Sequence, residues 1–521
     1  MSEKKSNSPS ITDVDIENGI TTYVSPHTGK PIHLKDTKDE ALDYILSHDT
    51  EQPSLDEKTD RKLLFKIDCF LLPFICLLYA VQFMDKLSNS YAAIMGLRED
   101  LNMEGDMYSW TGSAFYIGYL VFEFPCAYTL QKFPVINTVC VYIIIWGIIL
   151  CLHAVPGYEG FIALRTLLGA FESSVTPAFV IVTSQWYKKE EVFLRTALWF
   201  SFNGVGMMLG SGAIAYNLHA NMNSYSIEAW KLIFIITGAI TIALGIAIFF
   251  HIPNKPTKAW FLTEHEKRLV VERIRGNQQG FGNKTFKKYQ LIEAFTDIKT
   301  WLYFFIGMSS NIPNGGLTNF GSILLNESFD YDVGQSLLVQ VVFGVVEVVG
   351  CSLFAYCYRF YPKRLFWANA ANVVVLMGLC LVAFAPGKHA QLAGYALFYL
   401  CPLVMICGLS SCASNVAGHT KKVTVNAIFL IGYCVGNLIG PQTFRDEQAP
   451  DYVGAKVAMV VCSAATTLFL VAVWVLMARE NRVRDAAAGA TGTNVEDFDK
   501  IENHEFADLT DKENPLFRYT I

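Results

Sequence analysis

Stretches of about twenty apolar residues recur along most of the chain and are separated by shorter polar segments. A helix of about twenty apolar residues crosses the ~30 Å hydrocarbon core of a bilayer. The pattern therefore predicts a chain of membrane-spanning helices. Twelve are expected, at residues 65–94, 108–131, 135–154, 161–185, 195–219, 230–251, 300–325, 334–357, 365–386, 391–414, 424–444 and 455–478.

Polar segments flank these spans and divide them in the middle. A hydrophilic stretch lies between the sixth and seventh spans, and within it Thr263 and Glu266 have the capping-box spacing that begins a helix. The acidic end of the chain, from about Arg484, is expected to be flexible. The predicted organisation is a disordered cytoplasmic segment at 1–62, an N-terminal six-helix half at 63–251, a cytoplasmic connector at 252–299, a C-terminal six-helix half at 300–478 and an acidic cytoplasmic tail at 479–521.

Glycines mark corresponding places in the two halves. Gly206 and Gly210 in the fifth span, and Gly432, Gly436 and Gly440 in the eleventh, recur every four residues on one helix face. Such faces let neighbouring backbones approach closely. Either set alone indicates ordinary helix packing, but their matching positions favour an internal repeat. The expected fold is an all-α membrane protein of twelve helices in two pseudo-symmetric six-helix halves, an arrangement typical of secondary transporters.

Composition agrees with this picture and excludes several function classes. Hydrophobic residues make up 52% of the 521 and charged residues 17%, whereas soluble domains carry about 25% charge. All thirteen cysteines fall inside predicted spans without metal-site spacing, which favours packing roles over disulfides. The chain shows no metal-ligand cluster, nucleophile elbow or phosphate loop, and no basic patch with interleaved aromatic residues. We therefore expect neither an enzyme nor a nucleic-acid partner, and no cofactor.

Basic residues indicate the orientation of the chain. Lysines such as Lys132, Lys188 and Lys421 follow even-numbered spans, while acids such as Glu99 and Glu327 follow odd-numbered spans. By the positive-inside rule, both termini are expected to be cytoplasmic. The plasma membrane is the default location for an importer, and an endoplasmic-reticulum or vacuolar location is also compatible with the sequence.

The first span carries two adjacent charges, Asp85 and Lys86, in "YAVQFMDKLSNSYAAIMG". A charged side chain at the bilayer centre costs about 2.5–3.5 kcal/mol on insertion scales, so such residues indicate function. Lys86 is a natural anchor for an anionic substrate, and Asp85 is near enough to tune or neutralise it. The alternative is that the helix ends near Met84 and the pair lies at the outer interface.

The fourth span, "RTLLGAFESSVTPAF", places Arg165 and Glu172 two helical turns apart on one face. Arg165 is a candidate second contact for an anion, or it extends to the aqueous face. Glu172 is a candidate proton carrier, because a buried carboxyl group can load and release a proton near neutral pH, or it is a fixed hydrogen-bonded acid. Glu123 and Glu347 are lone acids in the second and eighth spans, where a proton site and a structural role are both open.

The seventh span, "SSNIPNGGLTNFG", contains Pro313 followed by two adjacent glycines. These residues weaken a helix and predict an interruption facing the Asp85–Lys86 site, with a simple proline kink as the alternative. Three amides surround it, at Asn311, Asn314 and Asn319. Amides can donate to and accept from a polar ligand. Near the end of the eleventh span, Asn437 and Gln442 are placed either to reach the same cavity or to pack.

Several segments together resemble one transporter family: "FMDKLSNSYAAIMGLREDL", "AFYIGYLVFEFP", "RTLLGAFESSVTPAF", "NIPNGGLTNFG" and "NVAGHTKKVTVNAIFLIGYCVGNLIGPQTF". Residues from about 60 to 480 resemble the fungal allantoate permease group of the anion:cation symporters, within the major facilitator superfamily. The resemblance implies a rocking twelve-helix carrier for small organic anions, usually taken up with protons. It also implies an anion-binding base at Lys86 and a functional pair at Arg165 and Glu172. The loop after the second span, "LQKFPV", departs from the superfamily signature, so gating contacts are not transferred.

The sequence thus predicts a monomeric, proton-coupled importer of a small carboxylate that works by alternating access in the lipid bilayer. The alternative is a nutrient receptor that signals through its long tails. The residues expected to bind substrate are Lys86, Arg165, Asn311, Asn314, Asn319 and Gln442. The residues expected to take part in proton coupling are Glu172, Asp85 and Glu123.

Overall fold

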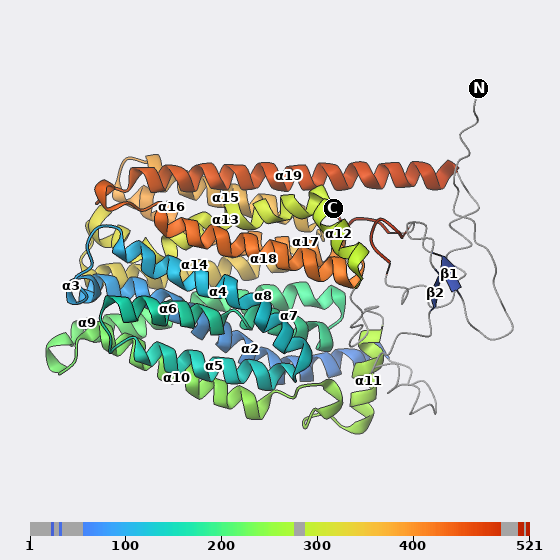
Figure 1. Cartoon of the computed structure of the whole chain (residues 1–521), viewed down its shortest axis with the longest axis horizontal. Coiled ribbons are helices and arrows are strands. Elements are labelled where there is room, and N and C mark those ends of the chain that lie inside the picture. The colour runs from blue at the N-terminus through green and yellow to red at the C-terminus, as the bar shows by residue number, and fades with distance from the viewer. Residues whose placement is uncertain (1–21, 25–30, 34–55, 276–286, 491–508, 515–516) are drawn as a thin grey trace.

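The computed structural model describes residues 22–24, 31–33, 56–275, 287–490, 509–514 and 517–521. Almost all of them belong to one bundle of long helices (Figure 1). Before the bundle, β1 (Thr22–Val24) and β2 (Pro31–His33) form a short antiparallel pair. This pair lies in the segment predicted to be disordered, whose remaining residues up to 55 are outside the described part of the chain.

Six spans form the N-terminal half, which occupies the lower part of Figure 1. They are α2 (Glu57–Ala92) with the π-helical η3 (Ala93–Leu97) and α3 (Arg98–Asp100), α4 (Met107–Lys132), α5 (Val135–Leu152), α6 (Tyr158–Glu172) with α7 (Val175–Trp186), α8 (Lys189–Met207) with the π-helical η4 (Met208–Ala215) and α9 (Tyr216–Ala220), and α10 (Ala229–His251), with a 3₁₀ turn η5 (Met222–Ser224) before the last.

Six further spans form the C-terminal half. They are α13 (Ile298–Ile323) with the π-helical η7 (Leu324–Ser328), α14 (Val333–Tyr358), α15 (Arg364–Phe384), α16 (Lys388–Phe398) with α17 (Pro402–Asn415), α18 (His419–Gln442), and α19 (Val453–Ala490), with a 3₁₀ turn η8 (Asp446–Gln448) before the last. Ten of the twelve spans are long and apolar enough to cross a membrane by length and composition, and α4 and α13 have 26 residues each. The prediction of an all-α membrane protein with two six-helix halves is confirmed.

The connector joins the halves at the end of the bundle where α2 begins and the last described residues lie, which we call the terminal end, at the right of Figure 1. It contains the 3₁₀ turn η6 (Pro256–Lys258), α11 (Glu264–Arg275) and α12 (Lys288–Thr296). The capping box is present, because the Glu266 amide donates to Thr263 Oγ1 and the Thr263 amide donates to Glu266 Oε2. The same Glu266 carboxylate pairs with Lys66 of α2 at 2.8 Å, so α11 is held against the N-terminal half.

The glycine faces lie where two matching pairs of helices touch. A methyl group on Gly206 of α8 would clash with the backbone carbonyl of Ala80 on α2, and one on Gly436 of α18 would clash with that of Met308 on α13. The first and fifth spans therefore pack as the seventh and eleventh do. Because the same close contact between two helices recurs in each half, the glycine pattern indicates an internal repeat as well as local packing.

Helix α13 runs without interruption through Pro313, so the predicted break in the seventh span is wrong. Several of its polar side chains bond to their own helix, as Asn311 Nδ2 does with the Gly307 carbonyl at 2.8 Å. The glycines allow α13 to pack closely against α18. A methyl group on Gly315 would come within 2.5 Å of the Asn437 carbonyl oxygen. Helix α2 is likewise continuous to Ala92, which excludes the alternative that it ends near Met84.

The end of the chain packs against the C-terminal half (Figure 1). Asp511 Oδ1 lies 2.5 Å from Lys421 Nζ, Lys299 Nζ donates to Tyr519 Oη at 2.7 Å, and the Thr520 amide donates to Asn415 Oδ1 at 2.7 Å. We call these three contacts the C-terminal clasp. The prediction of a flexible tail is wrong for these residues, because acids that look solvated in the sequence meet buried lysines in the fold.

Asp297, at the start of α13, lies beside the clasp. Burial by itself would raise the pKa of its carboxyl group, but the ammonium groups of Lys299, Lys421 and Lys512 outweigh burial and hold that pKa below its ordinary value. A carboxyl group with a lowered pKa in the folded state contributes stability above its unfolded pKa and loses it as the pH falls through the folded value. The clasp region is therefore expected to loosen in acid.

Replacing Asp511 by asparagine is expected to lower the free energy of unfolding by about 1–3 kcal/mol, because it removes a charged partner from Lys421 in a buried setting. Lys421 and Asp511 are both 1% exposed, and Glu293 and Asp297 still contact Lys421. The apparent unfolding temperature of the purified protein measures the effect.

Asp485→Asn is the matched control, since its ion pair with Arg518 is 2.8 Å long but its side chain is 65% exposed. An exposed pair contributes little. Equal unfolding temperatures for the Asp511 and Asp485 variants would contradict a stabilising role for the clasp.

Candidate functional site

The two halves contact each other at the end of the bundle opposite the terminal end, at the left of Figure 1. Three contacts between the halves share this end: Tyr108 Oη with the Asn319 carbonyl at 2.8 Å, Ser90 Oγ with Ser322 Oγ at 2.9 Å, and Arg98 with Glu327 at 2.8 Å. We call this set the seal. The seal therefore joins the two halves at that end of the molecule.

A pocket lies between the halves. Helices α2, α4, α7 and α8 of one half and α13, α14, α17 and α18 of the other contribute to its wall. Small-molecule sites of transporters lie at such an interface between repeats. The position of the pocket between the halves, with asparagines, tyrosines and Lys86 in its wall, suits a small polar solute.

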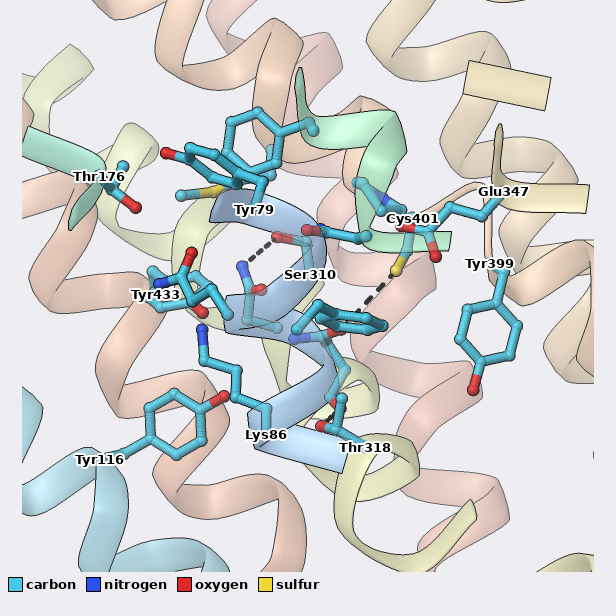
Figure 2. Close-up of a pocket in the computed structure, with 18 of the residues that line it drawn as sticks. Tyr79, Lys86, Tyr116, Thr176, Ser310, Thr318, Glu347, Tyr399, Cys401 and Tyr433 are labelled. Carbon is cyan, nitrogen blue, oxygen red and sulfur yellow. Dashed lines mark hydrogen bonds between the residues drawn. The ribbon is translucent and has the colours of Figure 1, made fainter. Parts of the chain in front are cut away.

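Lys86 projects into this pocket from α2, between Tyr116 and Tyr433 (Figure 2). Its ammonium nitrogen lies 2.9 Å from Glu172 Oε1, where Glu172 ends α6 and is 0% exposed. Among the residues that the structure describes, Lys86 is the only lysine or arginine in the pocket wall. Among the described residues, the pocket wall thus carries one cationic side chain, Lys86, and that side chain is paired with the buried carboxylate of Glu172.

Asp85 points away from the pocket, although it precedes Lys86 in the chain. Its Oδ2 atom accepts hydrogen bonds from Trp146 Nε1 at 2.8 Å and from Thr241 Oγ1 at 2.7 Å. Successive residues on a helix point about 100° apart, which separates the two charges. The carboxylate that pairs with Lys86 is therefore Glu172, in place of the expected neighbour Asp85, and Asp85 instead ties α2 to α5 and α10.

Arg165 lies behind the pocket wall. Its Nε atom donates to the Thr111 carbonyl at 3.0 Å, and its guanidinium lies 5.3 Å from the centre of the Phe115 ring. Lys86 Nζ lies 5.8 Å from the centre of the same ring. Because Arg165 is 2% exposed, the alternative that it extends to the aqueous face is excluded.

The other predicted site residues divide between the pocket and its surroundings. Asn311 and Asn314 line the pocket. Asn319 belongs to the seal, while Gln442 Nε2 donates to Ser113 Oγ at 2.9 Å and so joins α18 to α4. Glu123 lies outside the pocket wall, with an oxygen 4.0 Å from Cys434 Sγ.

The structure adds residues that the sequence did not single out. Five tyrosines line the pocket: Tyr79, Tyr116, Tyr119, Tyr399 and Tyr433. The spacing of three between Tyr116 and Tyr119 in "AFYIGYL" places both on one helix face and was the available signal. Glu347 also lines the pocket, and within the described residues neither of its carboxyl oxygens has a hydrogen-bond partner.

Comparisons with known proteins agree with this architecture. Residues 75–441 match the sequence profile of the Major Facilitator Superfamily. The chain is 48% identical to the allantoate permease of Saccharomyces cerevisiae, with 98% of this chain and 95% of the relative covered. It is 50% identical to an uncharacterized transporter of Schizosaccharomyces pombe, with 93% of each chain covered.

Solved structures show the same fold. The proton:xylose symporter XylE bound to 6-bromo-6-deoxy-D-glucose superposes with a TM-score of 0.59 at 12% identity, covering 77% of this chain and 95% of that one. The E. coli fucose:proton symporter FucP superposes with a TM-score of 0.54 at 14% identity, covering 78% and 99%. The chain therefore belongs to the Major Facilitator Superfamily, where it groups with the fungal allantoate permease, and it is a multi-pass membrane transporter and not an enzyme.

Proposed function

We propose that the protein is a proton-coupled symporter that imports a small organic anion by alternating access. The observation that carries this proposal is the Lys86–Glu172 ion pair, with its ammonium group in the pocket wall and its carboxylate buried behind. An isolated charge is costly in such a setting, so the empty carrier keeps its cation neutralised. An anion that enters the pocket then competes with Glu172 for Lys86.

This competition supplies the coupling. One ammonium group cannot offset two adjacent carboxylates, because like charges in a poorly solvated site repel strongly. If a proton binds Glu172, Lys86 is released to pair with the carboxylate of the substrate. The substrate and the proton are therefore bound together and released together, which is the requirement for symport.

The neighbouring residues support this arrangement. We assign the polar substituents of the substrate to Asn311 and Asn314, which share the pocket wall with Lys86. Arg165 acts one layer behind the wall and orients α4 through the Thr111 carbonyl. Asn319 and Gln442 act in contacts between the halves.

The seal supports a mechanism of alternating access. We propose that both termini are cytoplasmic and that the sealed end faces outward, so the conformation described is closed to the outside. Basic residues at the terminal end, including Lys188, Arg195 and Lys421, support this orientation. Breaking the seal while the halves close at the terminal end would expose the pocket to the outside. The plasma membrane is the proposed location of the carrier.

Uptake of labelled anions by cells that lack related carriers tests the function. The similarity to allantoate permease makes allantoate the first candidate, beside ureidosuccinate, nicotinate, pantothenate, biotin and simple monocarboxylates. Uptake of one anion should be faster at acidic than at neutral external pH and should be lost with a protonophore. No uptake of any anion by protein shown to be at the cell surface would contradict the proposal and favour the receptor alternative.

A further inference from the structure

Glu347 lies in the pocket wall without a partner of its own. It is 0% exposed on α14, and both carboxyl oxygens lack a hydrogen-bond donor in the part of the chain that the structure describes. Leaving a buried polar group unpaired costs about 1–3 kcal/mol, and more if it is charged. A lone buried acid in a pocket therefore indicates that something else supplies the donor.

Close packing around the Cβ atom of Glu347 holds this side chain in the pocket wall. On the facing helix α8, a methyl group added to Gly204 would come within 3.1 Å of the Glu347 Cβ atom. The stem of Glu347 is thus held between the two halves of the carrier. Its carboxyl group lies beside Cys401, on the opposite side of the pocket from Lys86 and Tyr116 (Figure 2).

Asn314 adds a second acceptor next to Glu347. Its Nδ2 group is already used, since it donates to Asn437 Oδ1 at 2.9 Å. Among the described residues, the side-chain carbonyl oxygen of Asn314 has only the weak Cys401 thiol as a donor, at 3.9 Å. This side of the pocket therefore presents oxygen acceptors, whereas the Lys86 side presents a cation.

We infer that Glu347 and Asn314 form a second subsite that accepts hydrogen bonds from N–H groups at the end of the substrate far from its carboxylate. This inference rests on the proposed function and deepens it. The substrate class is then a bipolar molecule with a carboxylate at one end and a urea, amide or ammonium group at the other. A site built to accept such bonds discriminates against ligands that lack them, because its own polar groups stay unpaired.

A pair of matched ligands tests the inference in the unmodified protein. In 3-ureidopropionate the far end carries two nitrogen donor groups, whereas in 5-oxohexanoate methylene and methyl groups replace them at nearly the same size. Competition against a labelled substrate in membrane vesicles measures both affinities. We expect 3-ureidopropionate to bind about 10- to 100-fold more tightly, since 5-oxohexanoate leaves the buried oxygens of the site unpaired. Equal affinities would overturn the inference without need of any variant.

The variant Glu347→Gln tests whether Glu347 causes the preference for 3-ureidopropionate. It should weaken binding of 3-ureidopropionate about 10-fold or more and leave binding of 5-oxohexanoate unchanged, and Glu347→Asp should restore part of the preference. Glu159→Gln, at an exposed position in the first turn of α6, is the control for expression and folding. Equal weakening of both ligands, or a changed pH dependence for both, would assign Glu347 to packing or to the proton and overturn the subsite.

Failure of the proposed function gives a different result. Lys86→Gln removes the contact that both ligands share, so it should weaken both. If that variant binds both ligands normally, the anion site is elsewhere and the proposed function fails, whatever Glu347 does. If neither ligand binds the unmodified protein, the proposed substrate class fails and the inference fails with it.

Discussion

Replacing Lys86 by glutamine is expected to reduce uptake of the anion by about 100- to 1000-fold. Losing one partner of a buried charge pair in a binding site costs about 2–5 kcal/mol, and each 1.36 kcal/mol is a factor of ten. Lys86 lies 2.9 Å from Glu172, and no other described lysine or arginine lines the pocket to replace it. Initial rates of labelled uptake, corrected for the amount of protein at the cell surface, measure the loss.

Two controls separate transport from folding. Lys388→Gln makes the same substitution in an ion pair with Asp330 of the same 2.9 Å length, but there the lysine side chain is 52% exposed. That variant should transport normally, because exposed pairs contribute little. The double variant Lys86→Gln with Glu172→Gln removes both charges, so it should fold and still fail to transport. Substantial uptake by the double variant would contradict the role of Lys86.

Replacing Glu172 by glutamine is expected to uncouple transport from the proton gradient. Lys86 would then be permanently available to the substrate, so the anion should still bind and exchange across the membrane. Accumulation driven by acid should be lost, because each pH unit of gradient provides about 1.4 kcal/mol per proton, a factor of ten in accumulation. Uptake at acidic and neutral external pH, compared with counterflow at equal pH on both sides, measures the two properties separately.

Glu123→Gln is the matched comparison, since it also removes a buried acid from a membrane span but one outside the pocket wall. Under the proposal it keeps acid-driven accumulation. The opposite result, with accumulation lost in Glu123→Gln and kept in Glu172→Gln, would assign the proton to Glu123. Uphill uptake by both variants would leave Asp85 as the acid to change next.

The sequence determined the number of spans, the division into halves and the faces on which glycines bring helices together. These properties depend on local periodicity and on the energetic cost of placing charge in hydrocarbon. Both can be judged from the sequence of each segment by itself. It also marked Lys86 and Glu172 as candidate functional residues, because a charge inside an apolar run is energetically costly whichever way the side chain points. In the seventh span the same reasoning was wrong. Pro313 disfavours a helix in isolation, but α13 packs along α18 and remains continuous.

Tertiary structure alone decided which charges meet. Asp85 was the apparent partner of Lys86 in the chain, but rotation along α2 turns it toward Trp146, and the end of α6 brings Glu172 to the lysine instead. The clasp between Asp511 and Lys421 was hidden for the same reason. Ion pairs depend on the rotation and contact of helices far apart in sequence, and a pattern read along one segment contains neither.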